Sequence, residues 1–298
     1  MSVVKNRYDF VFLFDCQDGN PNGDPDSDNS PRFDPETFQG LVSDVCLKRK
    51  VRDYVLYANS ESGTVRNGYD IFVLAGNTLE SRQKMPYQEL KEEIKPEGSK
   101  TKAADIEKAR AWMCRRFFDI RAFGAVMSTT EFNCGQVRGP IQLTFARSID
   151  RVLATEHTIS RQAFTGEKDI KNSTGTFGRK HTIAYGLYVA HGFINPMFAE
   201  RTGFSEEDLA TFWNALRCMF DVDRSAARGL MSTRGLYIFK HESKLGNAQA
   251  QTLFESVSVT RKEGVASPRA FSDYAVALPA ATPAGVEFLN GTVQATAV

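Results

Sequence analysis

The first apolar segment of the chain most constrains the fold, because it is apolar on both faces and ends abruptly in a polar loop. Residues 7–15 read RYDFVFLFD, and Val11 and Leu13 fall on the face opposite four alternating rings. These rings belong to Tyr8, Phe10, Phe12 and Phe14. A strand with two apolar faces is covered on both sides, which predicts a central strand of a sheet.

The polar segment that follows, DCQDGNPNGDPDSDNSPR at residues 15–32, allows three interpretations. It can be a rigid, turn-rich loop in which Asn and Asp side chains bond their own backbone. It can be a calcium loop, because the pattern D-x-N-x-N-G starting at Asp18 opens like an EF-hand, although Asn29 replaces the glutamate at the twelfth position. It can also be a magnesium-dependent active site. The aspartates available for that are Asp24, Asp26 and Asp28. The turn-rich loop is favoured, and we expect no bound metal.

Composition limits the class of protein. The 298 residues are 42% hydrophobic and 24% charged, which is typical of a globular protein with a packed core. No apolar run approaches the roughly 20 residues of a membrane span, and the N-terminus does not resemble a secretory signal. Five cysteines without a Cys-x-x-Cys pair indicate buried thiols in a reducing cytoplasm. Four histidines without metal-ligand spacing complete the expectation of no membrane, no metal and no cofactor.

The order of predicted elements indicates an α+β fold. Reduced to its frame, the chain reads strand, helix, strand, strand, helix, strand, which is the ferredoxin-like βαββαβ order that RNA-recognition modules also use. One helix begins at the capping residue Ser43, and a second follows a capping box formed by Ser205 and Asp208. We predict one domain with two insertions. The frame comprises residues 1–57 (with the acidic loop at 15–34), 138–155 and 183–298, and the insertions are 58–137 and 156–182.

Charge is distributed unevenly along the chain. Residues 1–36 carry three basic and eight acidic side chains, residues 37–200 carry 24 basic and 18 acidic, and residues 201–298 carry ten of each. The net charges are therefore −5, +6 and 0. A local basic surface can attract a polyanion even when the whole chain is nearly neutral.

Basic residues cluster in three segments that could contact nucleic acid. In the first predicted helix the apolar ladder of Leu47, Val51 and Val55 is expected to leave four cations outward, where they repel one another unless an anion binds. They are Lys48, Arg49, Lys50 and Arg52. The second insertion combines cations for phosphates with rings for base stacking. Its candidates are Arg161, Phe164, Lys171, Arg179, Lys180 and His181. Arg228 and Arg234 form a third, weaker candidate. The alternative for each segment is a solvated surface.

Several longer motifs together resemble a known family. GNPNGDPD, SDVCLKRKVRDYV, FFDIRAFGAV, RGPIQLTFARSID, GRKHTIAYGLYVAHGF and SAARGLMSTRGLYIF are similar to the backbone subunit of the type I-C CRISPR Cascade complex, in the RAMP superfamily. The resemblance runs from residue 7 to about residue 260. It implies a hand-shaped protein whose palm is the βαββαβ frame, whose fingers are residues 58–137 and whose thumb is a β-hairpin at 156–182.

The resemblance also implies a function and partners. Several copies would line up head to tail along one CRISPR RNA, together with other Cascade subunits, and present the guide for pairing with target DNA. Cleavage would belong to a recruited nuclease-helicase, so the chain itself would not be an enzyme. Phe164 is the candidate for displacing a base, and the acidic loop could meet the basic surface of the next copy. The alternative is a metal-dependent endoribonuclease that uses aspartates of the 15–34 loop, as related type III subunits do.

Overall fold

The computed structural model describes residues 2–94, 102–128, 131–161, 163 and 176–292. At its centre lies β1 (Tyr8–Gly19), which pairs antiparallel with β12 (Thr176–Ile194) on one side and with β13 (Leu230–His241) on the other. The sheet continues in the order β16-β13-β1-β12-β10-β4, with β9 and β11 also paired to β12. Its outer strands are β16 (Val286–Asn290), β10 (Ala146–Arg151), β4 (Gln39–Val42), β9 (Ile141–Leu143) and β11 (Ala154–Arg161).

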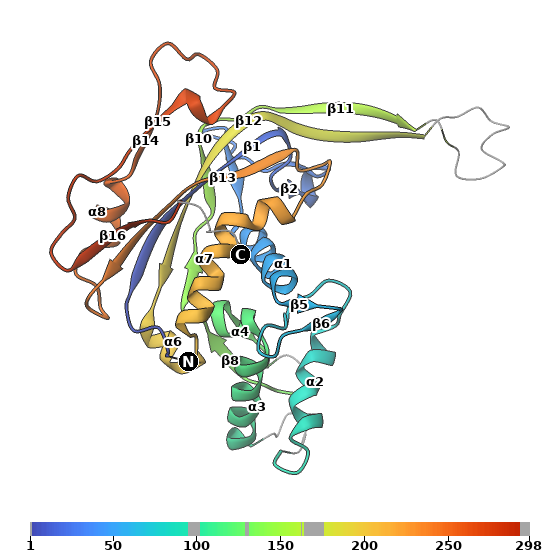
Figure 1. The fold of residues 1–298 in the computed structure, drawn as a ribbon. Coiled ribbons are helices and arrows are strands. Elements are labelled where there is room, and N and C mark those ends of the chain that lie inside the picture. Colours follow the sequence, from blue (N-terminus) through green and yellow to red (C-terminus); the bar gives the residue numbers. More distant parts are fainter. Residues whose placement is uncertain (1, 95–101, 129–130, 162, 164–175, 293–298) are drawn as a thin grey trace.

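Both faces of β1 are covered, as the alternation of its apolar residues predicts. The face that carries Phe10 and Phe12 packs against the two long helices α1 (Asp44–Ala58) and α7 (Glu206–Val222) (Figure 1). Trp213 of α7 meets the Phe10 ring edge-on, with 5.0 Å between centroids. Val11 and Leu13 pack on the other face against the C-terminal part of the chain. The chain therefore has a mixed α and β fold with a central antiparallel sheet.

The two long helices begin where their capping residues predict. The Ser43 hydroxyl accepts a hydrogen bond from the Cys46 amide at 3.2 Å, so α1 starts at Asp44. At α7 the Ser205 hydroxyl accepts from the Asp208 amide while the Asp208 carboxylate accepts from the Ser205 amide, which is the predicted capping box.

The described residues of the range 58–137 build a smaller layer below the sheet, with two short hairpins and three helices (Figure 1). The elements are β5 (Ser60–Glu61), β6 (Thr64–Val65), α2 (Leu79–Glu89), α3 (Ala103–Arg116), α4 (Phe118–Phe123), β7 (Gly124–Val126) and β8 (Gln136–Arg138). The layer has its own apolar core around Trp112, Met113 and Phe117. The helical segment breaks at Phe117, between α3 and α4, because Phe117 bridges to Asp70 and the Phe118 amide donates to the Asp70 carbonyl.

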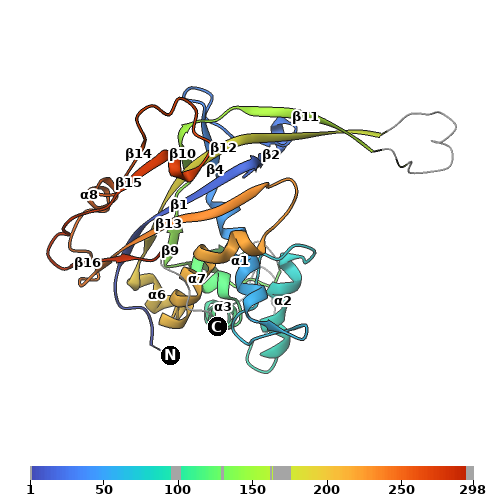
Figure 2. The same ribbon diagram turned by 45° about the horizontal axis from the view of Figure 1, so that its top comes forward.

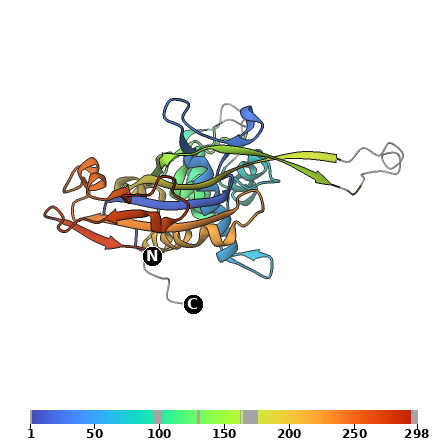
Figure 3. The same ribbon diagram turned by 90° about the horizontal axis from the view of Figure 1, so that it is seen from above.

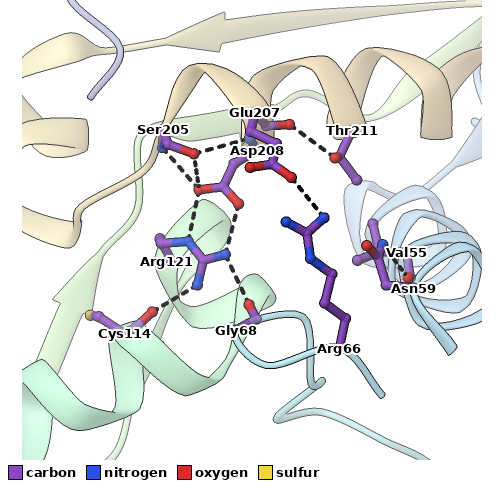
Figure 4. A network of polar contacts seen from close by, with 10 residues as sticks. All are labelled: Val55, Asn59, Arg66, Gly68, Cys114, Arg121, Ser205, Glu207, Asp208 and Thr211. Carbon is purple, nitrogen blue, oxygen red and sulfur yellow. Dashed lines mark hydrogen bonds and ion pairs between the residues drawn. The ribbon is translucent and has the colours of Figure 1, made fainter. Parts of the chain in front are cut away.

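A buried arginine joins this layer to the sheet layer. Arg121 of α4 makes two hydrogen bonds, at 2.8 and 2.7 Å, to the carboxylate of Asp208 in α7 (Figure 4). Its remaining donors reach the carbonyls of Cys114 and Gly68. Both charged side chains are less than a tenth exposed, so each needs the other to remain satisfied.

The strands β11 and β12 extend beyond the sheet as a two-stranded ribbon. Their antiparallel ladder runs from Ala154 opposite Ile183 to Arg161 opposite Thr176. Figure 3 shows the ribbon projecting from one side of the body. Because β12 is continuous from the ribbon into the sheet, the position of the ribbon is fixed by the sheet itself.

Short elements complete the chain. The 15–34 loop contains β2 (Gly23–Asp24), η1 (Pro25–Ser27) and β3 (Ser30–Pro31), and α6 (Pro196–Thr202) precedes α7. The second sheet face is covered by α8 (Ala250–Glu255), β14 (Ser258–Arg261), η3 (Phe271–Asp273) and β15 (Tyr274–Ala277). All five cysteines are free thiols. In the described ranges no helix combines the length and the apolar character that a membrane crossing requires.

Candidate nucleic-acid interface

Three segments that are distant in sequence meet where β1 ends. A Cβ atom at Gly19 would lie 2.0 Å from the carbonyl oxygen of Arg228, so only glycine lets the end of β1 approach the loop at 223–229 this closely. From the ribbon, Lys180 Nζ donates to the Ala226 carbonyl of the same loop at 2.6 Å. The middle of α1 joins them through Lys50, which pairs with Asp223 of the same loop. We call this convergence the β1-end cluster, and it consists of Arg49, Lys50, Arg179, Lys180, His181 and Arg228.

Lys50 is buried, and the prediction that it points outward is wrong. Its side chain is 1% exposed and its ammonium forms an ion pair with Asp223 at the end of α7. The same carboxylate oxygen of Asp223 lies 3.1 Å from Nε of Arg228. Burial lowers the pKa of Lys50, and the positive charge of Arg228 lowers it further. Burial would raise the pKa of Asp223, but the Lys50 bond and the surrounding cations outweigh it and lower the pKa.

The remaining cations of α1 also have carboxylate partners within the chain. Lys48 contacts Asp44 one turn earlier at 2.8 Å, and Arg52 contacts Asp119 of α4 at 2.8 Å. Both are mostly covered, so the predicted outward face of four cations does not exist. Of the four, only Arg49 is well exposed, at 65% of its side chain.

The ribbon brings its cations to the acidic loop. Arg179 is 66% exposed and lies 3.3 Å from Glu156 of the paired strand and 3.8 Å from Asp28. His181 Nε2 lies 3.7 Å from the same Asp28 carboxylate, too far for a hydrogen bond. Within the described residues, both His181 Nε2 and Asn20 Oδ1 are buried without a hydrogen-bond partner. A buried polar atom without a partner is a position where a ligand or water can bind.

The acidic loop is turn-rich, as the favoured interpretation of its sequence predicts. The Asp24 carboxylate accepts from the Asp26 backbone amide, and Nδ2 of the Asn20 side chain donates to the Asn29 carbonyl at 2.7 Å. Asn22 accepts from the Ser43 hydroxyl, which ties the loop to the start of α1. Of the two asparagines that an EF-hand would use as ligands, Asn22 already has its Oδ1 engaged by Ser43, whereas Asn20 Oδ1 has no hydrogen-bond partner in the described residues. No three His, Cys, Asp or Glu side chains in the described part of the chain gather as metal ligands.

Arg234 lies apart from the β1-end cluster. Its Nε is 2.7 Å from the Asp15 carboxylate, which also accepts from the Tyr185 hydroxyl at 2.9 Å. Burial raises the pKa of Asp15, and the bonds from Arg234 and Tyr185 oppose that rise. The Arg234 guanidinium also stacks over Phe271. Arg234 is therefore the partner of a buried carboxylate inside the sheet, a role that the sequence does not reveal.

Comparison with known proteins identifies the family. The family model described as CRISPR-associated protein Cas7 matches residues 6–279. The chain belongs to the Cas7 family. A CRISPR-associated protein Cas7 from Haloferax volcanii is 28% identical over 237 residues, which cover 71% of this chain and 64% of that relative's length.

Solved structures give weaker likenesses. A chain of a CRISPR RNA-guided surveillance complex, pre-nicking, has a TM-score of 0.48 at 16% identity and covers 78% of each chain. A chain of the type III-B Cmr-beta complex bound to cognate target RNA has a TM-score of 0.40 at 10% identity, covering 78% of this chain and 61% of that one. Both scores are low, so the family assignment rests on the match over residues 6–279.

Three candidates in this Cas7-family chain are not placed by the structure. Phe164 and Lys171 lie outside the described residues. The backbone of Arg161 pairs with Thr176 at the end of the described ribbon, and its side chain is not described.

The partners of the predicted cations were visible in the sequence only in part. Asp44 and Asp53 stand one helical turn from Lys48 and Arg49, which is the spacing of stabilising helix pairs. Asp223 is 173 residues from Lys50, and no local pattern connects them.

Proposed function

We propose that this Cas7-family chain is the non-catalytic backbone subunit of a type I-C Cascade complex in the cytoplasm, where it binds CRISPR RNA. The observation that carries the proposal is the convergence of exposed or half-exposed cations from three segments at the β1-end cluster. Arg49, Arg179 and Arg228 reach the same end of the sheet from a helix, a ribbon and a loop. Such a surface suits a phosphate backbone, which any guide sequence presents alike.

We assign the parts of the hand accordingly. The palm is the ferredoxin-like βαββαβ frame of residues 1–57, 138–155 and 183–298, the fingers are residues 58–137 and the thumb is the hairpin at 156–182. In support, the strand order β13-β1-β12-β10 with α1 and α7 on one face is the arrangement that such a frame requires. The ribbon that carries Arg179 starts from this frame. An RNA strand bound by the thumb would therefore also pass the palm.

The proposed partners are those of a subunit that binds along a single RNA strand. Copies bind head to tail, because a heterologous contact that does not close gives an open helical filament. Each copy leaves guide bases free to pair with target DNA, while other Cascade subunits and a recruited nuclease-helicase supply the remaining functions. The protein requires no metal or cofactor for this role.

The first experiment is to express the chain with its neighbouring genes, purify it and sequence the nucleic acid that remains bound. We expect RNA of uniform length with repeat-derived ends. Random fragments or no RNA would contradict the proposed function.

The alternative, a metal-dependent endoribonuclease, is favoured by one observation: Asp28 of the acidic loop is 71% exposed. The donor set does not fit a metal well, because Asp24 pairs with Arg32 at 3.2 Å and Asp28 faces Arg179 and His181. Labelled RNA incubated with Mg²⁺ or with a chelator tests this alternative. Cleavage that requires Mg²⁺ and is lost in Asp28→Asn would establish it.

A further inference from the structure

Two exposed phenylalanines form a stacked pair at the edge of the sheet. Phe33 and Phe38 are 42% and 50% exposed, and their rings lie nearly parallel, at 11°, with 6.0 Å between centroids. Leu153, which follows the residue whose amide bonds the Phe38 carbonyl, is 81% exposed. Large apolar side chains that remain together at a surface usually meet another molecule. We call Phe33 and Phe38 the phenylalanine pair.

The backbone holds the pair in place at a cost. Phe38 has φ +59°, in the left-handed region that a bulky residue rarely adopts. The Phe38 amide donates to the Asp34 carbonyl at 2.8 Å, and the Phe38 carbonyl accepts from the Val152 amide at 2.8 Å. These bonds close a tight turn over residues 34–38. A strained conformation that the surroundings enforce is often found at functional positions.

The turn is fixed to the strand beside it. Arg147 of β10 contacts the Asp34 carboxylate at 2.8 Å, and the Ser148 hydroxyl accepts from the Gly40 amide at 2.8 Å. Figure 2 shows β4, which begins directly after the pair, next to β10 and the base of β11. The rings are therefore held rigidly at the base of the ribbon. Little further conformational entropy of this turn is lost when a ligand binds.

We propose that the phenylalanine pair binds an unpaired base of single-stranded RNA by stacking, which rests on the proposed function. A flat ring can extend the stack on the exposed ring surface. Cations for the adjoining phosphates lie nearby, since Arg151 of β10 is exposed opposite Gln39 and pairs with no carboxylate in the described residues. An aromatic surface beside basic side chains is the usual arrangement for single-stranded nucleic acid.

The test uses Phe38→Gly, because glycine accepts the left-handed conformation without strain. We expect this variant to be at least as stable to heat as the wild type, yet to bind a fluorescently labelled, unstructured RNA roughly 10-fold more weakly, about 1.4 kcal/mol. Stacking releases no counterions, so the slope of log affinity against log salt concentration stays unchanged. Phe38→Trp is expected to retain affinity. Tyr57→Ala, which removes an exposed ring from the end of α1, is the matched control.

Each outcome decides between the two proposals. Equal RNA affinity of Phe38→Gly and a binding-competent wild type would overturn the stacking site alone. A wild type without affinity for RNA would overturn the proposed function and the stacking site with it. If Phe38→Gly changes the sedimentation of the protein but not its RNA affinity, the pair meets another protein chain and the stacking site is wrong.

Discussion

At the scale of single residues, Lys50 and Asp223 differ in exposure. This difference determines how much stability is lost when either partner of the pair is replaced. Lys50 is 1% exposed, whereas the Asp223 side chain is 21% exposed and also contacts Arg228. Removing the carboxylate leaves a buried ammonium, so we expect Asp223→Asn to lower the free energy of unfolding by about 3–5 kcal/mol. Lys50→Met fills the same space without a charge and leaves Asp223 with Arg228, so its cost is expected to stay below about 1.5 kcal/mol. Urea unfolding measures both.

The same pair predicts a pH dependence. The folded pKa of Asp223 lies below its ordinary value of 3.8, so the folded state binds fewer protons in that window and the pair stabilises it above pH 3.8. This stabilisation is lost as pH falls through the folded pKa. The difference in unfolding free energy between the wild type and Asp223→Asn should be constant near neutral pH and shrink below pH 3.8. A difference that grows on acidification would show that another group controls the pair.

At the scale of elements, the Arg121–Asp208 contact joins α4 to α7 and so fixes the 58–137 layer on the sheet layer. Arg121→Ala removes the cation that pairs with the 4%-exposed Asp208 side chain and the donors to two carbonyls, leaving only Ser205 of the described residues bonded to that carboxylate, and we expect a loss of about 3–5 kcal/mol in unfolding free energy. Arg121→Lys keeps the charge but not the paired donors, so it should rescue only part of the loss.

The matched control for this joint is Arg66→Ala. Arg66 contacts Glu207 of α7 at 2.7 Å, but the two side chains are 52% and 36% exposed, so little change in stability is expected. Equal effects of Arg121→Ala and Arg66→Ala would mean that the buried contact contributes no more than a surface pair.

The elements also show how far the sequence determines the fold. Local patterns sufficed for β1, for the Ser43 cap and for the Ser205 capping box, because each depends on neighbours within four residues. The break at Phe117 depends on Asp70, and the burial of Lys50 depends on Asp223. The strands β9 and β10 are separated for a similar reason: the Thr144 amide donates to the His191 carbonyl of β12, and Phe145 is left 54% exposed. Long-range partners of this kind leave no periodic pattern in the sequence.

At the scale of the whole molecule, the acidic loop is the candidate contact between copies. Asp24 and Asp28 already face Arg32 and Arg179 of their own chain, whereas Asp26 is exposed and has no ion pair within the described ranges. Neutralising all three with Asn should impair assembly on guide RNA, and Asp26→Asn alone should account for part of the effect without changing stability. Sedimentation of the complex measures assembly, with Glu263→Gln as an exposed acidic control. Full assembly of the triple variant would exclude the loop from the contact.

If the chain binds RNA as proposed, we expect the electrostatic part of binding to come from the β1-end cluster as a whole. Each phosphate contact on a single strand releases counterions and adds roughly 0.7 to the slope of log affinity against log salt concentration. Arg49 and Arg179 are the well-exposed cations that α1 and the described ribbon contribute. We expect Arg49→Ala and Arg179→Ala each to weaken RNA binding at low salt. Each should also flatten the slope by roughly 0.7, the contribution of one phosphate contact.

The double variant tests whether α1 and the ribbon contact the same strand. If both arginines bind phosphates independently, the reductions in slope should add, since the residues share no partner. Arg52→Met is the informative comparison, because Arg52 is mostly covered by Asp119 and should leave the slope unchanged while lowering stability. A slope that is insensitive to both exposed arginines but sensitive to Arg52 would place the RNA on the α4 side of α1. The convergence at the end of β1 would then serve folding alone, and the described part of the ribbon would not bind phosphate through Arg179.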